Sequence, residues 1–584
     1  MNRFAVLFLF VTTFAAATFG VCQSPRATMA EDASAARSTM RDRWFYVSYN
    51  LADDSGADNV VNLIERAGKV NLNGMLWSAP WDRADEWSTE EIARFERIKR
   101  AAQTSGVEII PILWSIGYGT MTGRNPNLAE GLLIRDLPLV ARDGRASFAP
   151  SSDASFVCDM ETGEGDNLAN LQGFQDRAGT SSFCDREVFH GGSAALRFEK
   201  METDPYGHGR VMWELTLEPE RLYRASIWIK VSDLIGRPLL QAYSMSGDQL
   251  AAQSLSAKAD ANGKVAFEWR KAEILFRTPA DGKVRVYAGV WDGKSGQIWV
   301  DDLAVEPVGL VNPLQRPGAP ITVTSEDAAT IYERGKDWEL PEFRVAPWKT
   351  DAPSLSLVIP DGSRISDGES LRVNYYYPPL VGAPQIGTCM SEPEVYEYFE
   401  KSAAAVVKLL NPQKWFLSMD EIRCANTCEA CHARGESLAE ILADCITKQR
   451  AIIKNVRPDA EIYIWSDMLD PNHNAHANYY VCEGDYSGVW DLIPKDLIIS
   501  CWWYEMREKS MEFFSSHGFK TQGAAYYDTD NLDGCADWLE LCTRTPNCLG
   551  IMYTTWQRKY DLLEGFGKLV DPSNVQASAT APAP

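Results

Sequence analysis

The stretch Trp415-Phe416-Leu417-Ser418-Met419-Asp420-Glu421 contains the pattern that decides the fold of this chain. Its first five residues are mostly apolar and have the composition of a strand buried on both faces, and two adjacent carboxylates follow directly. Strands buried on both faces are typical of parallel sheets, in which the carboxyl ends of the strands meet at one edge. The stretch therefore predicts a buried parallel sheet with acidic groups at its carboxyl edge.

Eight further stretches have strand-like composition, and helical patterns separate several of them. Over residues 89–103, for example, apolar side chains recur at helical spacing. Alternating strands and helices predict an α/β fold, a (β/α)8 TIM-type barrel of parallel strands. Nine candidates exceed eight places, so one of them, with 371–377 as the first choice, is expected to lie outside the barrel or not to be a strand. The candidates are 44–49, 75–77, 107–113, 371–377, 415–419, 462–466, 497–502, 523–527 and 549–554.

Between about 151 and 307 the helical period disappears, and short alternating strands replace it. This alternation is typical of an antiparallel β-sandwich. The segment around Phe156, the turn and strand 190–196 and the closing stretch 299–303 resemble, in this order, the jelly-roll carbohydrate-binding modules. We therefore expect an inserted jelly-roll domain. The expected divisions are a first barrel part at 43–147, the inserted sandwich at 148–310, a connecting segment at 311–370 and a second barrel part at 371–570.

Two expectations concern side chains of the sandwich. Cys158 and Cys184 are predicted to form a disulfide, because the thirteen cysteines of the chain fit an oxidising compartment. Alternation along the strands predicts that at least half of four tryptophans are core residues, although each of them could also bind sugar. The four are Trp228, Trp269, Trp291 and Trp299.

The amino terminus has the features of an export signal. Met1-Asn2-Arg3 is positively charged and precedes an apolar run, 5–19, that is short for a transmembrane helix. Residues 1–22 are therefore predicted to be a cleaved signal peptide, with lipidation at Cys22 as the alternative, and the protein to be periplasmic or extracellular. No later stretch is apolar enough to span a membrane. The proline-rich tail 571–584 is expected to be disordered.

The charge excludes one class of partner. The chain has 80 acidic and 57 basic side chains, for a net charge of −23. Such a field repels phosphate backbones, so we expect no nucleic acid partner. The sequence assigns no cofactor and no metal to the site described next, and it leaves the oligomeric state open.

Carboxylates and aromatic residues follow the strands of the second barrel part. Strand ends meet at one rim of a barrel, and aromatic rings beside carboxylates suit a glycan better than a phosphate. Adjacent carboxylates repel each other, which raises one pKa and leaves the other group ionised. His473 and His476, three residues apart, could form a ligand pair or belong to a substrate loop, but the expectation is that they are solvated loop residues. The candidates are Asp420 and Glu421 as catalytic groups, and Trp465, Asp467, Trp502, Trp503, Tyr526, Tyr527, Asp528 and Trp556 as substrate-binding groups.

The order of these features resembles the catalytic domain of the family 20 glycoside hydrolases, the β-N-acetylhexosaminidases, over residues 43–120 and 370–565. That family has an Asp-Glu pair after its fourth strand, then tryptophans at strand ends, a tyrosine closely followed by an aspartate, and a last strand ending in tryptophan. The stretches 419–423 and 553–557 are more closely similar to uncharacterised exported bacterial proteins with an inserted carbohydrate-binding-like module. The resemblance implies a hydrolase that acts on an amino-sugar-containing or related glycan.

The resemblance also implies substrate-assisted retention, in which the acetamido oxygen of the sugar attacks the anomeric carbon. Glu421 would protonate the leaving oxygen and later activate water, and Asp420 would hold the acetamido nitrogen. Tyr526 or Tyr527 would bind the acetamido oxygen, Asp528 a ring hydroxyl, and the tryptophans would wall the methyl pocket. The chain lacks the family's His-x-Gly-Gly run before the acidic pair and its arginine near the end of the first strand.

Two other functions remain as alternatives. One is a catalytically inactive glycan-binding protein on a barrel scaffold, and the other is a c-type haem protein that uses Cys428-Glu-Ala-Cys431-His432. The same region also allows a radical S-adenosylmethionine cluster on Cys424, Cys428 and Cys431, or zinc on Cys428, Cys431 and His432 or Cys445. Disulfides that stiffen the loop beside the active site are the expectation here.

Overall fold

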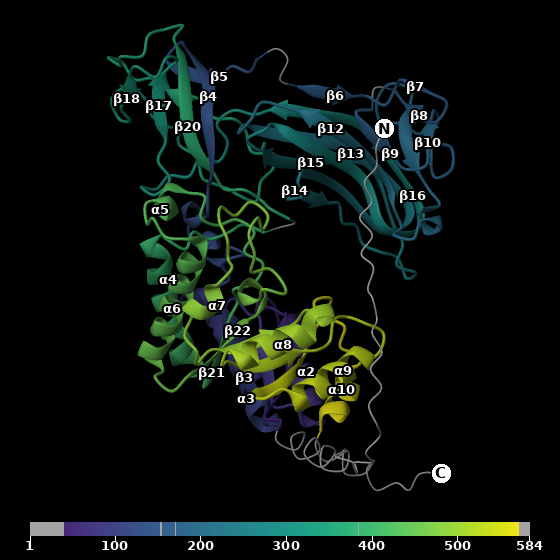
Figure 1. The fold of residues 1–584 in the computed structure, drawn as a ribbon, viewed down its shortest axis with the longest axis vertical. Coiled ribbons are helices and arrows are strands. Elements are labelled where there is room, and N and C mark those ends of the chain that lie inside the picture. The colour runs from purple at the N-terminus through teal and green to yellow at the C-terminus, as the bar shows by residue number, and fades with distance from the viewer. Residues whose placement is uncertain (1–39, 152–154, 170, 383–384, 572–584) are drawn as a thin grey trace, which may run out of the picture.

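The computed structural model describes residues 40–151, 155–169, 171–382 and 385–571. The predicted signal peptide at 1–22 lies outside these residues, as does the predicted tail beyond Asp571. Eight parallel strands form a closed barrel in the lower part of Figure 1. In barrel order, the strands are β1 (Asp42–Val47), β2 (Gly74–Trp77), β3 (Glu108–Leu113), β21 (Lys414–Leu417), β22 (Glu461–Trp465), β23 (Ile498–Cys501), β24 (Lys520–Ala524) and β25 (Cys548–Tyr553).

A helix lies between each pair of consecutive barrel strands along the chain, and a last helix follows β25. Two of the helices begin with a capping box, Ser88 with Glu91 and Ser437 with Glu440, which satisfies free backbone N–H groups of the first turn. No helix in the described parts of the chain is long and apolar enough to cross a membrane. The helices are α2 (Asp54–Gly68), α3 (Thr89–Ser105), α4 (Pro393–Leu409), α5 (Glu429–His432), α6 (Leu438–Val456), α7 (Val489–Leu492), α8 (Arg507–Ser516), α9 (Asp533–Arg544) and α10 (Leu563–Val570).

Side chains that alternate along the barrel strands fill two separate cores. Trp44, Phe416 and Tyr463 belong to the smaller core, whereas Trp415 and Leu417, which flank Phe416, belong to the larger core shared with the helices. Because both faces of a strand are buried, the strands have near-continuous apolar sequences. This explains why the eight barrel strands were predictable from composition.

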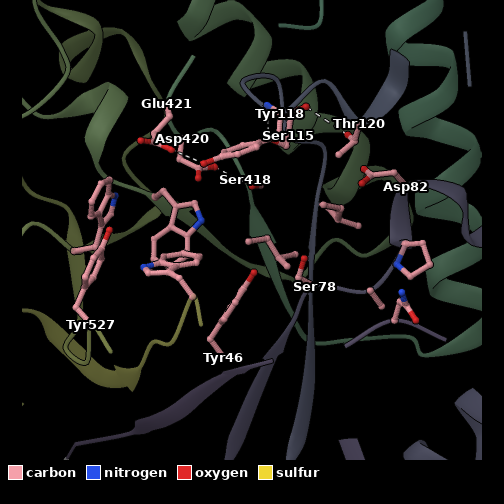
Figure 2. A pocket seen from close by; sticks show the side chains of 18 residues that line it. Tyr46, Ser78, Asp82, Ser115, Tyr118, Thr120, Ser418, Asp420, Glu421 and Tyr527 are labelled. Atoms are coloured by element: carbon pink, nitrogen blue, oxygen red, sulfur yellow. Dashed lines mark hydrogen bonds between the residues drawn. The ribbon is translucent and has the colours of Figure 1, made fainter. Parts of the chain in front are cut away.

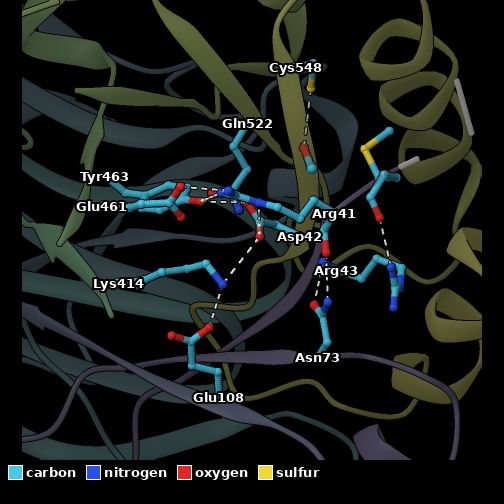
Figure 3. Close-up of polar contacts among 12 residues, drawn as sticks. Arg41, Asp42, Arg43, Asn73, Glu108, Lys414, Glu461, Tyr463, Gln522 and Cys548 are labelled. Carbon is cyan, nitrogen blue, oxygen red and sulfur yellow. Dashed lines mark hydrogen bonds and ion pairs between the residues drawn. The ribbon is translucent and has the colours of Figure 1, made fainter. Parts of the chain in front are cut away.

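Charged side chains connect the amino-terminal ends of several strands at the other end of the barrel (Figure 3). The carboxylate of Asp42, which is fully buried, accepts hydrogen bonds from Arg41 at 3.0 Å and from the Tyr463 hydroxyl at 2.6 Å. Lys414 lies 3.7 Å from Asp42 and 2.5 Å from Glu108. The network therefore links β1 to β3, β21 and β22 and leaves the buried carboxylate well paired.

Replacing Asp42 by alanine is expected to lower the free energy of unfolding by about 3 kcal/mol, because it leaves buried cationic and hydroxyl partners without their acceptor. Denaturant unfolding followed by tryptophan fluorescence measures the change. Asp54→Ala is the control, since its side chain is 70% exposed and pairs with arginine at the surface, where such pairs contribute at most about 1 kcal/mol. Equal effects of the two variants would contradict this role of the network.

The inserted segment forms a nine-stranded antiparallel sheet (upper right in Figure 1). Its long strands β13 and β16 pair over most of their lengths, with irregularities that bend them. The predicted antiparallel strands are thus confirmed. The strands are β6 (Phe156–Cys158), β9 (Gly173–Gln175), β10 (Ser182–Asp185), β11 (Ala195–Phe198), β12 (Gly209–Thr216), β13 (Leu222–Ser244), β14 (Gln249–Ser254), β15 (Val265–Arg277) and β16 (Lys283–Pro307), beside a separate pair β7 (Gly163–Glu164) and β8 (Asn167–Leu168).

Two side-chain predictions for this segment are wrong. Cys158 and Cys184 are both free thiols, and the Cys158 Sγ contacts the sulfur of Met160 instead. Among the four tryptophans, only Trp299 is buried, and its indole nitrogen donates to Asp185. The other three are half-buried because neighbouring surface side chains cover them, as His190 does by stacking on Trp228.

A six-stranded antiparallel sheet joins the segments on either side of the insertion (upper left in Figure 1). The predicted strand 371–377 is confirmed as lying outside the barrel, where it pairs with β4 in this sheet. We expected only a connection at 311–370, but three strands of the sheet lie there. They are very short, so they carry no periodic pattern. The strands are β4 (Leu132–Arg142), β5 (Arg145–Phe148), β17 (Thr322–Ser325), β18 (Ile331–Tyr332), β19 (Leu357–Val358) and β20 (Ser370–Tyr377).

Candidate functional site

A cavity of about 650 Å³ opens at the carboxyl ends of the barrel strands (Figure 2). All eight strands, or the loops that follow them, contribute to its wall. The carboxyl ends of the strands from both barrel parts therefore surround one cavity. The lining residues are Tyr46, Asn50, Ser78, Ala79, Pro80, Asp82, Ile112, Leu113, Ser115, Tyr118, Thr120, Ser418, Asp420, Glu421, Trp465, Trp502, Tyr527 and Trp556.

Side chains from three segments hold Glu421 at the cavity. Its Oε2 accepts hydrogen bonds from the Tyr118 hydroxyl and from Gln385 Nε2 at 3.1 Å, and its Oε1 pairs with Arg423 at 2.8 Å. The backbone of Glu421 is in the left-handed region, with φ of 47°, which costs a non-glycine residue about 1–2 kcal/mol. Its backbone N–H donates to Asp467 at 2.9 Å, so the fold sustains a strained conformation that directs this carboxylate.

Two neighbouring carboxyl groups have raised pKa values. Burial, followed by repulsion from Glu421, raises the pKa of Asp420 to about 6, while a hydrogen bond from Ser418 at 2.9 Å opposes the shift. Burial and then the charge of Asp420 raise the pKa of Asp467 to about 8. Asp467 also accepts hydrogen bonds from Asn474 at 2.9 Å and from the Trp502 indole at 3.3 Å. The site thus combines carboxyl groups that hold protons over different pH ranges.

Gly117 permits the loop after β3 to approach the acidic pair. A Cβ atom at this position would lie 2.2 Å from the carbonyl oxygen of Asp420 and 2.7 Å from that of Glu421. No side chain fits at such distances. The glycine therefore lets Tyr118, the next residue, reach the Glu421 carboxylate.

Aromatic rings form one side of the cavity. Trp502 and Tyr527 are nearly parallel, with ring centroids 6.3 Å apart and planes inclined by 7°, and Trp465 lies 6.0 Å from Trp556. Figure 2 shows Asp420 and Glu421 near this aromatic side. Apolar ring faces beside carboxylates are the arrangement that binds and orients sugar rings.

A second cavity, of about 580 Å³, shares Trp502 and Tyr527 with the first. His473 lies in its wall, with ring centroids 4.5 Å from Trp502 and 4.6 Å from Trp503, and burial lowers its pKa to about 4. His473 is therefore not the solvated residue we expected. His476 is exposed and contacts Tyr479 instead.

Seven of the ten predicted site residues line one of the two cavities, and three do not. Tyr526 is buried, stacks on Tyr553 and donates its hydroxyl to the Thr529 carbonyl. It points away because successive side chains of an extended segment alternate in direction. Asp528 accepts from the backbone of Trp556 at 2.8 Å and so braces the turn after β25. Asp467 lies behind the wall, where it positions Glu421 and Trp502.

Several residues that line the cavity or support Glu421 are not among the predicted site residues. Tyr46, Ser78 and Tyr118 lie near the carboxyl ends of strands in the first barrel part, and this position is the signal that indicates them. The sequence also indicates Arg423, because this residue lies two positions beyond Glu421. No sequence pattern indicates Gln385, because a loop far from any barrel strand brings it to the site.

The cysteine predictions near the site need correction. The twelve described cysteines are all free, so the predicted disulfides are not formed. The sulfurs of Cys428 and Cys431 lie 3.7 Å apart in a buried position, whereas His432 is bonded to Glu483 at the surface. Thiols buried this deeply, beside a histidine that is hydrogen-bonded at the surface, do not fit the c-type haem alternative. Cys424 faces Thr427 instead of the other two thiols, which argues against a three-cysteine iron–sulfur motif.

The raised pKa of Asp467 predicts how stability changes with pH. The unfolded chain loses this proton near pH 4 and the folded protein only near pH 8, so the free energy of unfolding falls as the pH rises between these values. Asp467→Asn removes this titration. The melting temperature of the variant, relative to the wild type, is therefore expected to rise steadily from pH 4 to pH 8, as thermal unfolding can measure.

The exposed Asp491 provides the control for this measurement. Asp491→Asn is expected to shift the melting temperature by the same small amount at every pH. A constant difference between Asp467→Asn and the wild type would contradict the raised pKa.

The fold and site define a barrel protein with an acidic, aromatic-walled cavity. No protein family matches the chain, and no curated protein matches it. Among solved structures, a β-N-acetylhexosaminidase is 14% identical, covers 32% of this chain and 45% of its own, and has a TM-score of 0.26. TmCBM61 in complex with β-1,4-galactotriose is 14% identical over 26% of this chain and 99% of its own, with a TM-score of 0.19.

A xylan-binding domain, CBM22-1 from Paenibacillus barcinonensis Xyn10C, is 13% identical over 26% of this chain and 92% of its own, with a TM-score of 0.20. At these low scores the likenesses establish neither a family nor a function. The functional argument therefore rests on the site.

Proposed function

We propose that this protein is an exported glycoside hydrolase that cleaves a bond in an amino-sugar-containing or related glycan. Its scaffold is a barrel of the (β/α)8 class, resembling family 20 glycoside hydrolases, with the carbohydrate-binding-like sandwich at 148–310 as an insertion. One observation carries the proposal: Asp420 and Glu421 line one cavity together with Trp465, Trp502, Tyr527 and Trp556. Carboxyl groups that exchange protons, beside rings that can hold a sugar, suit glycoside hydrolysis.

In this proposal Glu421 protonates the leaving glycosidic oxygen and then activates water. Asp420 accepts the acetamido N–H, so that the acetamido oxygen of the sugar attacks the anomeric carbon and leaves again when water attacks. Tyr527 binds the acetamido oxygen, because it lines the cavity and the other candidate, Tyr526, does not. Asp467 is a positioning residue, since it contacts the backbone of Glu421.

In the free protein three hydrogen bonds occupy the Glu421 carboxylate, two of them on Oε2, so we expect the leaving oxygen of the substrate to displace one of these partners. Tyr118 is the partner most easily displaced, since its side chain is 45% exposed and belongs to a loop. The glycosidic oxygen would take the place of its hydroxyl. Arg423 and Gln385 would keep the carboxylate in position.

The test is hydrolysis of a panel of aryl glycosides and oligosaccharides, with and without a 2-acetamido group, by the purified protein. Release that depends on the acetamido group supports the proposal with its substrate-assisted mechanism. Release that does not depend on the acetamido group supports a hydrolase but excludes a substrate-assisted mechanism. A folded protein that releases nothing from the panel would overturn the proposal, whether or not it binds glycans.

A catalytically inactive glycan-binding protein is the second candidate. The engagement of both Glu421 oxygens by three side chains favours it, because such a carboxylate is held as a binding group. Two cavities that share an aromatic wall would then form one extended binding surface. Calorimetry with the same panel distinguishes the candidates, since binding without turnover supports only this second one.

A further inference from the structure

Four buried side chains outside the cavity bring three thiols and a carboxylate together. The Cys389 Sγ lies 3.5 Å from that of Cys428 and 3.7 Å from that of Cys431, and the latter two are 3.7 Å apart. The Glu130 Oε2 lies 3.6 Å from the Cys431 Sγ. All four ligand atoms are within 4.8 Å of one another, and each residue is at most 1% exposed. The group is thus compact and closed to solvent.

These distances match a tetrahedral metal site. Zinc–sulfur bonds of about 2.3 Å and zinc–oxygen bonds of about 2.0 Å place neighbouring sulfurs roughly 3.8 Å apart, and sulfur and oxygen roughly 3.5 Å apart. A disulfide would require about 2.05 Å. We propose that Glu130, Cys389, Cys428 and Cys431 bind one zinc ion in a closed structural site. Thiolate-rich tetrahedral sets favour zinc over magnesium or calcium.

The carboxylate of Glu130 is oriented for this role. Its Oε1 accepts hydrogen bonds from the backbone N–H groups of Thr427 and Cys428, both at 2.9 Å, and from the Thr427 hydroxyl at 3.0 Å. Its Oε2 is left to face the sulfurs. Supporting donors of this kind fix a ligand atom toward a metal. An ionised carboxylate buried beside three thiolates would be costly, because the neighbouring Arg316 supplies only one positive charge.

The surroundings also suit an anionic metal–thiolate centre. Three thiolates and a carboxylate around a divalent cation leave two negative charges, and the guanidinium of Arg316 lies beside Cys389 and Cys428 with only 5% of its side chain exposed. Ser391 donates a hydrogen bond to the Cys431 sulfur at 3.2 Å. A buried cation and a sulfur-directed hydroxyl both stabilise such a centre.

The ligands come from three segments, and each of these segments also reaches the Glu421 site. Glu130 follows the loop that carries Tyr118, and Cys389 follows Gln385 by four residues. Cys428 lies five residues beyond Arg423. A zinc ion would therefore connect the loops that hold Glu421, without contacting substrate. The zinc proposal itself stands on the four ligands and does not rest on the proposed hydrolase activity.

The test begins with the purified full-length wild type, dialysed and analysed for metals. About one zinc per chain is expected. Replacement of zinc by Co²⁺ is expected to give the intense absorption of tetrahedral cobalt with thiolate ligands. X-ray absorption at the zinc edge is expected to show three sulfur ligands and one oxygen ligand. Neither measurement depends on a variant folding. No bound metal, or a stoichiometric metal other than zinc, would overturn the assignment, as would a disulfide mapped between Cys389 and Cys428.

Variants then test the ligands. Cys431→Ser and Glu130→Gln are expected to lose zinc to a competing chelator at least tenfold more readily than the wild type, in line with the importance of each ligand in a four-ligand site. Cys424→Ser is the matched control, because Cys424 is buried in the same segment but faces Thr427. Unchanged zinc retention in the folded Glu130→Gln variant would show that Glu130 is not a zinc ligand.

Discussion

The Glu421→Gln variant is expected to hydrolyse oligosaccharides about 10²–10⁴-fold more slowly than the wild type, the usual contribution of a positioned acid or base. Glutamine keeps the size of the side chain and an acceptor for Arg423 or Tyr118, but it has no proton to give to the leaving oxygen. Substrate binding is therefore expected to change little. Measurements of kcat by product release and of Kd by calorimetry separate the two effects.

Leaving-group chemistry makes this prediction specific. Aryl leaving groups depart with little protonation, so the variant is expected to lose less activity on aryl glycosides than on oligosaccharides. Glu512→Gln, at an exposed position of α8, is the control and should retain wild-type rates. An equal loss on both substrate classes would contradict an acid role for Glu421, and full activity would exclude it from the reaction.

The Asp420→Asn variant is expected to reduce kcat about 10²–10³-fold on 2-acetamido substrates, the range seen when one group that stabilises a transition state is removed. The ionised carboxylate can accept the acetamido N–H and stabilise the positive charge that develops on the attacking group. An asparagine cannot supply that charge. Ser418→Ala, which removes only the hydrogen bond to Asp420, should show a smaller loss.

The pH profile tests the same role. The pKa of Asp420 is raised to about 6, so the carboxyl group is neutral below this pH and charged above it. The wild-type kcat/KM is therefore expected to fall as the pH drops through about 6, and Asp420→Asn should lack this limb. Burial and then the charge of Glu421 raise this pKa. Glu421→Gln removes only the second cause, so the fall in the residual activity of that variant should occur at a lower pH than in the wild type. If kcat/KM of Asp420→Asn still falls in the same way below about pH 6, this pH dependence belongs to another group.

The barrel and the position of the acidic pair were predictable from local sequence. Buried strands such as 415–419 have a nearly unbroken apolar composition, and their ends show which residues reach the rim. The repulsion between the adjacent carboxylates also follows from their spacing alone. In the structure, Asp420 is the group of this pair whose pKa is raised. The same reasoning could not separate Tyr526 from Tyr527, since the side-chain direction at a strand end depends on where the extended backbone stops.

Contacts between distant segments were not predictable. Gln385 reaches Glu421, and Cys389 joins Cys428 and Cys431, through loops with no periodic pattern. The six-stranded sheet pairs β4 with β20, on opposite sides of an inserted segment of more than 150 residues. Very short strands such as β18 exist only because a partner lies beside them.

The sequence by itself determined the elements whose composition follows from burial, namely the barrel strands, the antiparallel segment and the acidic rim. Only the tertiary structure decided which thiols meet, which tyrosine enters the cavity and which side chains hold Glu421. The physical reason is that burial acts on every residue of a strand and leaves a local pattern, whereas a side-chain cluster needs one residue from each of several loops. Such a cluster forms only when the packed fold brings these loops together.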